Sequence, residues 1–176
     1  MTTSLVLTFV SHDKPGLVSA ISEKIADAEG SWLESRLARL AGEFAGIVLI
    51  SVPDANAPGL TAALHSLEEA GLRITVERTT SAPPEISYRT LDLELLGQDR
   101  PGIVRDVTHA LGQLGANIEE FSSGIESAPF TGETMFRAAA RLRVPGSVTT
   151  EDVQKILERL AEEMMVDLTS SENEDD

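Results

Sequence analysis

The chain has 176 residues, of which 41% are hydrophobic, enough apolar content for a folded core. It carries 29 acidic against 14 basic residues, a formal net charge of -15, and only 4% of its residues are aromatic. Nucleic-acid binding normally uses a cationic face and stacking rings, and anionic membranes also attract cations. The composition therefore predicts that the protein contacts neither nucleic acid nor membrane directly.

The absence of cysteine excludes disulfides, thiolate metal sites and cysteine nucleophiles. The first residues, MTTSLVLTFVSHDK, lack the basic region of a signal peptide, and no stretch approaches the length of a membrane span. We therefore expect a cytoplasmic protein. His12, His65 and His109 show no ligand spacing, and no nucleophile elbow, phosphate loop or dinucleotide motif occurs, so we expect no metal, cofactor or catalysis.

The stretch HDKPGLV at residues 12–18 recurs as QDRPGIV at residues 98–104. Each copy follows apolar residues that alternate with the period of a strand, namely Leu5, Leu7 and Phe9, and, 86 positions later, Leu91, Leu93 and Leu95. Helical spacing follows each Pro-Gly, over residues 17–25 and 103–114. Asp13 and Asp99 are expected N-caps of these helices, which are expected to end at Gly30 and Gly115.

Residues 31–53 are locally ambiguous, because Ser31 and Glu34 have the spacing of a capping box and the apolar residues after them suit a helix. The corresponding stretch of the second copy, ANIEEFSSGIE, has no such stripe. We therefore predict two strands here, with a turn at Ala41-Gly42-Glu43. Matching the copies leaves seven extra residues in the second hairpin.

A second helix and a last strand complete each copy. The helices are expected around Leu60, Leu64 and Leu67, and around Val153, Ile156, Leu157 and Leu160 after a cap at Thr149 or Thr150; the strands alternate at Leu72, Ile74 and Val76 and at Met164, Val166 and Leu168. The order strand, helix, strand, strand, helix, strand predicts an α+β fold with two ferredoxin-like units, each an antiparallel sheet with helices on one face.

The predicted boundaries are residues 1–79 for the first unit, 80–87 for a Pro-rich linker, 88–169 for the second unit, and 170–176 for an acidic, disordered tail. Val6 and Val10 are expected on the sheet face away from the helices, where an isolated unit would favour polar residues. We therefore expect the two units to pack on each other.

Gly16 and Gly102 are expected in the first turn of a helix, where glycine costs about 1 kcal/mol relative to alanine. One explanation is a ligand carboxylate that approaches the free N–H groups and positive dipole end of the helix. The other is tight packing of the loop against the helix. The sequence leaves both open.

Tandem units of this order, with D-x-P-G-[IL]-V at the first helix and G-x-[NW]-[IL]-E after it, resemble ACT domains, small regulatory modules that bind amino acids. WLESRLARLAGEFAGI at 32–47 and SAPFTGETMF at 127–136 are also similar to signature stretches of the glycine cleavage system transcriptional repressor family. The resemblance covers residues 4–169. It implies two ACT domains side by side and a non-enzymatic repressor that acts through a LysR-type activator, with glycine relieving the repression.

The resemblance also implies a ligand site at the two helix starts, made by Asp13, Gly16, Leu17, Asp99, Gly102, Ile103 and Asn117. Asn117 matches the asparagine that often contacts the amino acid's backbone groups from across the interface. We also expect a homo-oligomer. Copy one has Ser31-Trp32 there, so copy two is the better candidate. The long hairpin at 122–133, with Phe130, is expected to cover the ligand or meet a partner, the alternative being a tolerated insertion.

Two other functions remain open at this stage. Tandem ACT units can serve as a ligand-independent interaction or oligomerisation module. They can also act as the regulatory part of a metabolic enzyme.

Overall fold

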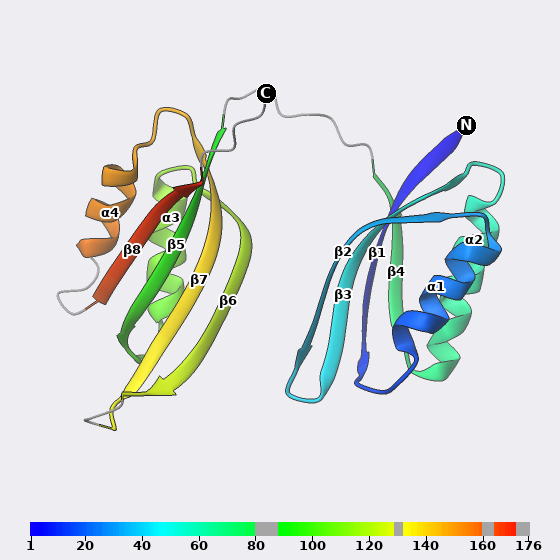
Figure 1. The fold of residues 1–176 in the computed structure, drawn as a ribbon, viewed down its shortest axis with the longest axis horizontal. Helices are drawn as coiled ribbons and strands as arrows, with labels where there is room; N and C mark the ends of the chain where they lie inside the picture. Colours follow the sequence, from blue (N-terminus) through cyan, green and yellow to red (C-terminus); the bar gives the residue numbers. More distant parts are fainter. Residues whose placement is uncertain (80–87, 129–131, 160–163, 172–176) are drawn as a thin grey trace. The chain divides into compact units, whose positions relative to one another are not determined.

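The structure is a computed structural model that describes residues 1–79, 88–128, 132–159 and 164–171. The chain forms two compact units, Met1–Ala82 and Pro83–Asp176 (Figure 1). The predicted linker, residues 80–87, and residues 172–176 of the predicted tail lie outside the described residues. Among the described residues, no helix combines the length and apolar character needed to cross a membrane.

Both units have the predicted order of elements. The first contains β1 (Thr2–His12), α1 (Leu17–Asp27), β2 (Ser31–Leu40), β3 (Glu43–Pro53), α2 (Ala57–His65), the short 3-10 helix η1 (Ser66–Ala70) and β4 (Arg73–Arg78). The second contains β5 (Tyr88–Gln98), α3 (Ile103–Gln113), β6 (Asn117–Ser127), β7 (Thr134–Pro145), α4 (Thr150–Glu158) and β8 (Met164–Ser171). The α+β, ferredoxin-like prediction is confirmed.

The described strands of each unit form one antiparallel sheet. The spatial order is β2-β3-β1-β4 in the first unit and β6-β7-β5-β8 in the second. The first strand of each unit therefore lies in the interior of its sheet, between the third and fourth strands. This order follows from two strand-helix-strand crossovers and a hairpin between the second and third strands.

In each unit, one face of the sheet packs against the two helices and forms the core (Figure 1). The alternation of β1 puts Leu5, Leu7 and Phe9 on this face, and the stripe of α1 covers them with Leu17, Ile21 and Ile25. The second unit repeats this pattern with Leu91, Leu93, Leu95, Ile103, Val107 and Leu111. Burial of these side chains is the main stabilising contribution, since a fully buried leucine or isoleucine contributes about 1.5–3 kcal/mol.

The other face differs between the units. In the first, Val6 lies opposite Leu49 and Val10 opposite Ala45, which makes an apolar strip along the middle of the sheet. In the second, the position of Val6 is taken by Asp92, whose carboxylate accepts a hydrogen bond from Arg141 Nε at 3.0 Å. The apolar strip is therefore interrupted in the second unit, although Leu96 takes the position of Val10 there. The packing of one unit on the other stays a prediction.

The ambiguous segment after α1 is a hairpin, as predicted. Ala41 and Gly42 connect β2 to β3 and have φ angles of 50° and 85°, the two left-handed residues of a tight hairpin turn. Trp32 packs half-buried against the core, and the register shifts between Trp32 and Glu34. Pairing with β3 and burial of Trp32 override the local helical pattern.

The two helix starts correct one prediction. The N-caps of α1 and α3 are Gly16 and Gly102, with left-handed φ angles of 89° and 87° and no capping side chain, so the prediction that Asp13 and Asp99 are N-caps is wrong. Both aspartates lie further back along the turn. The Asp13 N–H donates to the Gly42 carbonyl and the Asp99 N–H to the Thr134 carbonyl, each at 2.9 Å.

The C-terminal ends of α1 and α3 have the same hydrogen-bond pattern, but the left-handed residue at each end is of a different type. Gly115 has a φ of 70° after α3, as expected of a glycine cap, whereas after α1 the left-handed residue is Glu29, with a φ of 57°. Gly30 follows it and donates to the Ile25 carbonyl at 2.8 Å. A Cβ on Gly30 would lie 3.0 Å from the Ile25 side chain, so close packing accounts for this glycine.

The start of α4 confirms the expected cap. Thr149 accepts a hydrogen bond from the Asp152 N–H at 3.1 Å, and the Asp152 carboxylate accepts one from the Thr149 N–H at 2.9 Å. This reciprocal pair is a capping box. Its hydrogen bonds from the Thr149 N–H and hydroxyl lower the pKa of Asp152.

We predict that Gly16→Ala destabilises the first unit by about 1–2 kcal/mol, because an alanine there must adopt a left-handed backbone. The matched control is Gly59→Ala in α2, which should stabilise by roughly 0.5–1 kcal/mol. A Cβ at either position meets no atom within 4 Å, so only the φ angle distinguishes them. Urea unfolding followed by the fluorescence of Trp32, the one tryptophan, reports the first unit. Equal effects of the two substitutions would contradict the backbone explanation.

Candidate functional site

The start of α1 is a short turn that is anchored to the rest of the first unit. The carbonyl of Gly16 accepts the first helical hydrogen bond, from the Ala20 N–H at 2.9 Å. Lys14 Nζ donates to the Ala70 carbonyl at 2.5 Å, and Arg39 Nε donates to the Asp13 carboxylate at 2.5 Å. The turn is thus tied to η1 on one side and to β2 on the other.

A small apolar cavity of about 210 Å³ opens beside this turn. It is lined by Lys14, Pro15, Gly16, Leu17, Ala20, Leu67, Ala70 and Leu72. The N–H groups of the first helical turn lack intrahelical acceptors and, with the helix dipole, favour a negatively charged group nearby. The missing side chain of Gly16 leaves that approach open, since a Cβ there would meet nothing within 4 Å.

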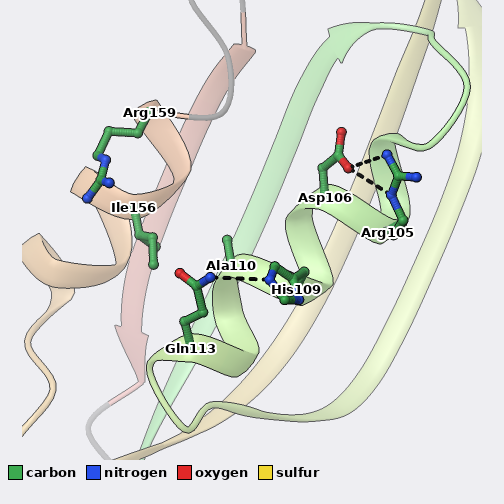
Figure 2. Close-up of a pocket in the computed structure, with 7 residues that line it drawn as sticks. All are labelled: Arg105, Asp106, His109, Ala110, Gln113, Ile156 and Arg159. Carbon is green, nitrogen blue, oxygen red and sulfur yellow. Dashed lines mark hydrogen bonds and ion pairs between the residues drawn. The ribbon is translucent and has the colours of Figure 1, made fainter.

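The start of α3 has the same backbone but a covered surface. Arg105 folds back toward Gly102, so a Cβ on this glycine would lie 3.1 Å from Arg105 Nη2. Asp106 holds the arginine there: its Oδ1 accepts from Arg105 Nη2 at 2.9 Å, and its Oδ2 accepts from Arg100 Nη1 at 2.7 Å. Figure 2 shows Asp106 and Arg105 joined on α3.

The first unit has no such cluster, for a reason visible in the repeat. The positions of Arg105 and Asp106, counted back by 86, hold Ser19 and Ala20. Without a carboxylate on this turn, Lys14 reaches Ala70 instead. The two helix starts therefore share a backbone shape and differ in what a ligand would meet there.

The hydrogen bonds from Arg100, and then those from Arg105, lower the pKa of Asp106. Charge-assisted hydrogen bonds stabilise the ionised carboxylate and outweigh the opposing effect of its burial. The Asp106 side chain is 23% exposed, so water screens part of this interaction.

Asn117, the remaining predicted site residue, is the first residue of β6 and is exposed. Asn117 follows the C-terminal end of α3, whereas Gly102 precedes the N-terminal end. The eleven residues of α3, at about 1.5 Å each, separate Asn117 from Gly102 by roughly 16 Å. One unit therefore brings Asp99, Gly102 and Ile103 together but leaves Asn117 at its other end. In the first unit, Asp13, Gly16 and Leu17 likewise lie together.

The long hairpin of the second unit is mostly strand. β6 runs to Ser127, so residues 122–127 pair with β7, and β7 begins at Thr134, whose carbonyl accepts from Asp99. The hairpin thus begins beside the α3 start. Phe130 lies outside the described residues, and covering of a ligand by this hairpin stays a prediction.

The chemistry available at both turns is binding chemistry. Backbone N–H groups, a basic side chain (Lys14 or Arg100) and apolar side chains can hold a small zwitterion. Within the described ranges, no three His, Asp or Glu side chains gather as a metal ion would require. The sequence analysis does not identify Arg105 and Asp106 as site residues. Their only sequence signal is a pair of adjacent, oppositely charged residues in the first helical turn.

We predict that Asp106 titrates below the ordinary aspartate pKa of about 3.9. Its carboxylate then stabilises the second unit above that ordinary pKa, and this stability is lost as pH falls through the lowered native pKa. Carboxyl carbon chemical shifts in an NMR pH titration measure the midpoint. Arg100→Gln and Arg105→Gln should each raise the midpoint, because the hydrogen bonds from both arginines stabilise the ionised carboxylate. A wild-type midpoint at or above the ordinary value would contradict the ion-pair geometry.

Sequence comparison matches both units to one kind of domain. Residues 3–77 and residues 92–163 each match a family model described as ACT domain. The glycine cleavage system transcriptional repressor of Escherichia coli (strain K12) is 25% identical over 162 residues, which is 91% of this chain and 85% of that protein. Phosphoserine phosphatase SerB2 of Mycobacterium tuberculosis is 29% identical over 136 residues, which cover 73% of this chain and 32% of the enzyme.

A solved structure matches nearly the full length of this chain. The crystal structure of an unknown protein from Galdieria sulphuraria superimposes with a TM-score of 0.85 and 32% identity, covering 97% of this chain and 99% of that one. Each unit here also has the βαββαβ order of an ACT domain. The chain therefore belongs to the ACT domain family, as a tandem of two ACT domains.

Proposed function

We propose that this protein is a non-enzymatic, amino-acid-responsive regulator that acts by contact with another protein. The observation that carries the proposal is the open apolar cavity beside the Gly16 turn, in a domain family that binds amino acids. A helix start with free N–H groups suits the carboxylate of an amino acid. The cavity beyond it is of a size suited to a small side chain.

The finer form of the proposal is a repressor of the glycine cleavage system. Similarity to the Escherichia coli repressor extends over 91% of this chain, at 25% identity. On this proposal the partner is a LysR-type transcriptional activator, and glycine relieves the repression. The formal charge of -15 supports action through a protein, because direct DNA binding would need a cationic face.

Within this proposal, the first unit is the better ligand site. The sequence favoured the second unit because of Asn117, but Arg105 covers Gly102 there, whereas nothing covers Gly16. Asn117 joins a site of this kind only when another ACT unit supplies the helix start, because its own α3 start lies at the opposite end of the helix. That other unit is either the first unit of the same chain or a unit of a second copy, so the proposal for the second unit includes a homo-oligomer as one of two arrangements.

The small size of glycine limits how tightly any site can bind it, and therefore the glycine concentrations to which the protein can respond. Glycine has five heavy atoms, and a ceiling of about -1.5 kcal/mol per atom gives roughly -7.5 kcal/mol, a low-micromolar dissociation constant at best. Aspartate rather than asparagine at Asp13 favours the ammonium group and opposes the carboxylate. The proposal therefore expects dissociation constants from micromolar to millimolar.

Thermal unfolding of the full chain in the presence of each free amino acid tests the proposal. A ligand at 100 times its dissociation constant stabilises the native state by about 2.7 kcal/mol, which raises Tm by several degrees. We expect glycine or another small amino acid to raise Tm. Stabilisation by none of them, at tens of millimolar, would refute amino-acid sensing.

A pair of variants on α1 then locates the site. Ala20→Leu fills the cavity and should abolish the Tm increase, while Ala26→Leu, on an exposed position of the same helix, should retain it. If both variants retain the increase, the ligand binds elsewhere. Affinity capture from cell extract, with and without the stabilising amino acid, tests the protein contact; a transcriptional activator released by the amino acid is the expected result.

A second candidate function is a regulatory subunit of a metabolic enzyme. The similarity to phosphoserine phosphatase SerB2 favours it, since this chain matches about a third of that enzyme's length. Capture of an enzyme instead of a transcriptional activator would select this function.

A further inference from the structure

The second unit carries a groove of about 470 Å³ between α3 and α4. Its volume falls within the range of roughly 300–1,000 Å³ typical of small-molecule pockets. Figure 2 shows its lining, with Arg105, Asp106, His109, Ala110 and Gln113 on α3, Ile156 on α4, and Arg159 as the C-cap that follows α4.

The groove has an apolar middle and polar sides. Ala110 and Ile156 lie between the two helices (Figure 2), where Ile156 packs partly buried against the core. His109 Nε2 and Gln113 Nε2 are 3.2 Å apart on the exposed side of α3. An apolar floor with a few polar groups at its edge is the usual composition of a ligand pocket.

Arg159 supplies a cation at the edge of the groove. It is exposed at the C-terminal end of α4, and its guanidinium has no ion-pair or hydrogen-bond partner among the residues that the structure describes. Arg105, by contrast, is already held by Asp106. A guanidinium offers a planar pair of N–H donors that matches a carboxylate, so Arg159 is the group through which an oxyanion would bind.

The first unit serves as an internal comparison, because its helices cover the same face. The positions equivalent to the groove lie 86 residues earlier on α1 and 93 earlier on α2, where buried Leu60 and Leu64 correspond to Val153 and Leu157. They hold Ser19, Ala20, Glu23, Lys24, Asp27, Ala63 and Ser66. Two carboxylates and one lysine in the first unit thus replace two arginines and one carboxylate in the second.

This difference is not a by-product of overall composition. The chain has twice as many acidic as basic residues, 29 against 14, yet the groove of the second unit has a positive formal charge. The shared fold does not require these side chains, since the first unit forms the same two helices without them. A cationic, partly apolar groove that arises in one unit alone indicates a function specific to that unit.

We propose that this groove binds a small organic carboxylate whose short, branched apolar body rests on Ile156 and Ala110 while its oxyanion pairs with Arg159. A single negative charge fits better than two, because Arg159 lies at the negative dipole end of α4 and Asp106 lines the same groove. The groove shares no lining residue with the Gly16 cavity of the first unit.

NMR titration of the full chain with 3-methylbutanoate tests the proposal. We expect saturable shifts of backbone amides on the facing sides of α3 and α4, with the uncharged isostere 3-methylbutanamide and inorganic phosphate each binding at least tenfold more weakly. If the amide bound as tightly as 3-methylbutanoate, the proposed pairing with Arg159 would be wrong. If phosphate bound as tightly, the proposed contact with the apolar floor would be wrong. Shifts confined to other elements, or no saturable shifts, would also overturn the site.

Arg159→Gln should weaken 3-methylbutanoate binding at least tenfold while leaving amide resonances outside the groove unchanged. Arg137→Gln, which removes an exposed arginine from β7 on the opposite face of the sheet, should leave the affinity unchanged. Equal affinity of wild type and Arg159→Gln would overturn the assignment. Amino-acid stabilisation measured on Arg159→Gln separates the two proposals, because it should persist whatever happens in the groove.

Discussion

The left-handed backbone of one glycine at each first helix start is the constraint on which the rest of each unit depends. Gly16 and Gly102 have φ angles of 89° and 87°, a conformation that side chains disfavour by about 1–2 kcal/mol. The residue after each glycine, Leu17 or Ile103, is already buried in the core. The turn therefore sets where the helix stripe meets the sheet, and the repeated Pro-Gly has a structural cause that holds with or without a ligand.

The fold was predictable because its signals are local and periodic. Alternation at Leu5, Leu7 and Phe9, followed by a helical stripe, requires only that one face of each element be apolar, and the repeat supplies the pattern twice. The β2–β3 hairpin was the hard case, since its residues also suit a helix. The second copy resolved it, because β6 pairs in the same way without helical spacing. Capping chemistry narrowed the start of α4 to Thr149 or Thr150, and the structure assigns the cap to Thr149.

The details of the candidate site were not predictable, because they depend on side-chain reach and backbone angle. Asp13 and Asp99 have the residue type of an N-cap, but the left-handed glycine takes that position and leaves them one turn too early. Hydrophobic periodicity does not indicate that Arg105 folds back over Gly102. Asp106 holds Arg105 there, and Asp106 is itself bound by Arg100, a loop residue outside the helical pattern. The same limit applies to Glu29, where hydrogen bonds to the end of α1 hold a left-handed residue that is not glycine.

One fold thus presents two different surfaces in one chain. Core positions such as Ile21 and Val107 keep their character because they fill the same space, whereas the exposed helix positions between them are free to diverge. In the first unit, the exposed residues leave an apolar cavity open beside Gly16. In the second unit, they cover the equivalent turn and line a cationic groove. A binding property inferred from the ACT fold therefore has to be argued unit by unit, from the side chains at each helix start, since the backbone that both units share does not distinguish them.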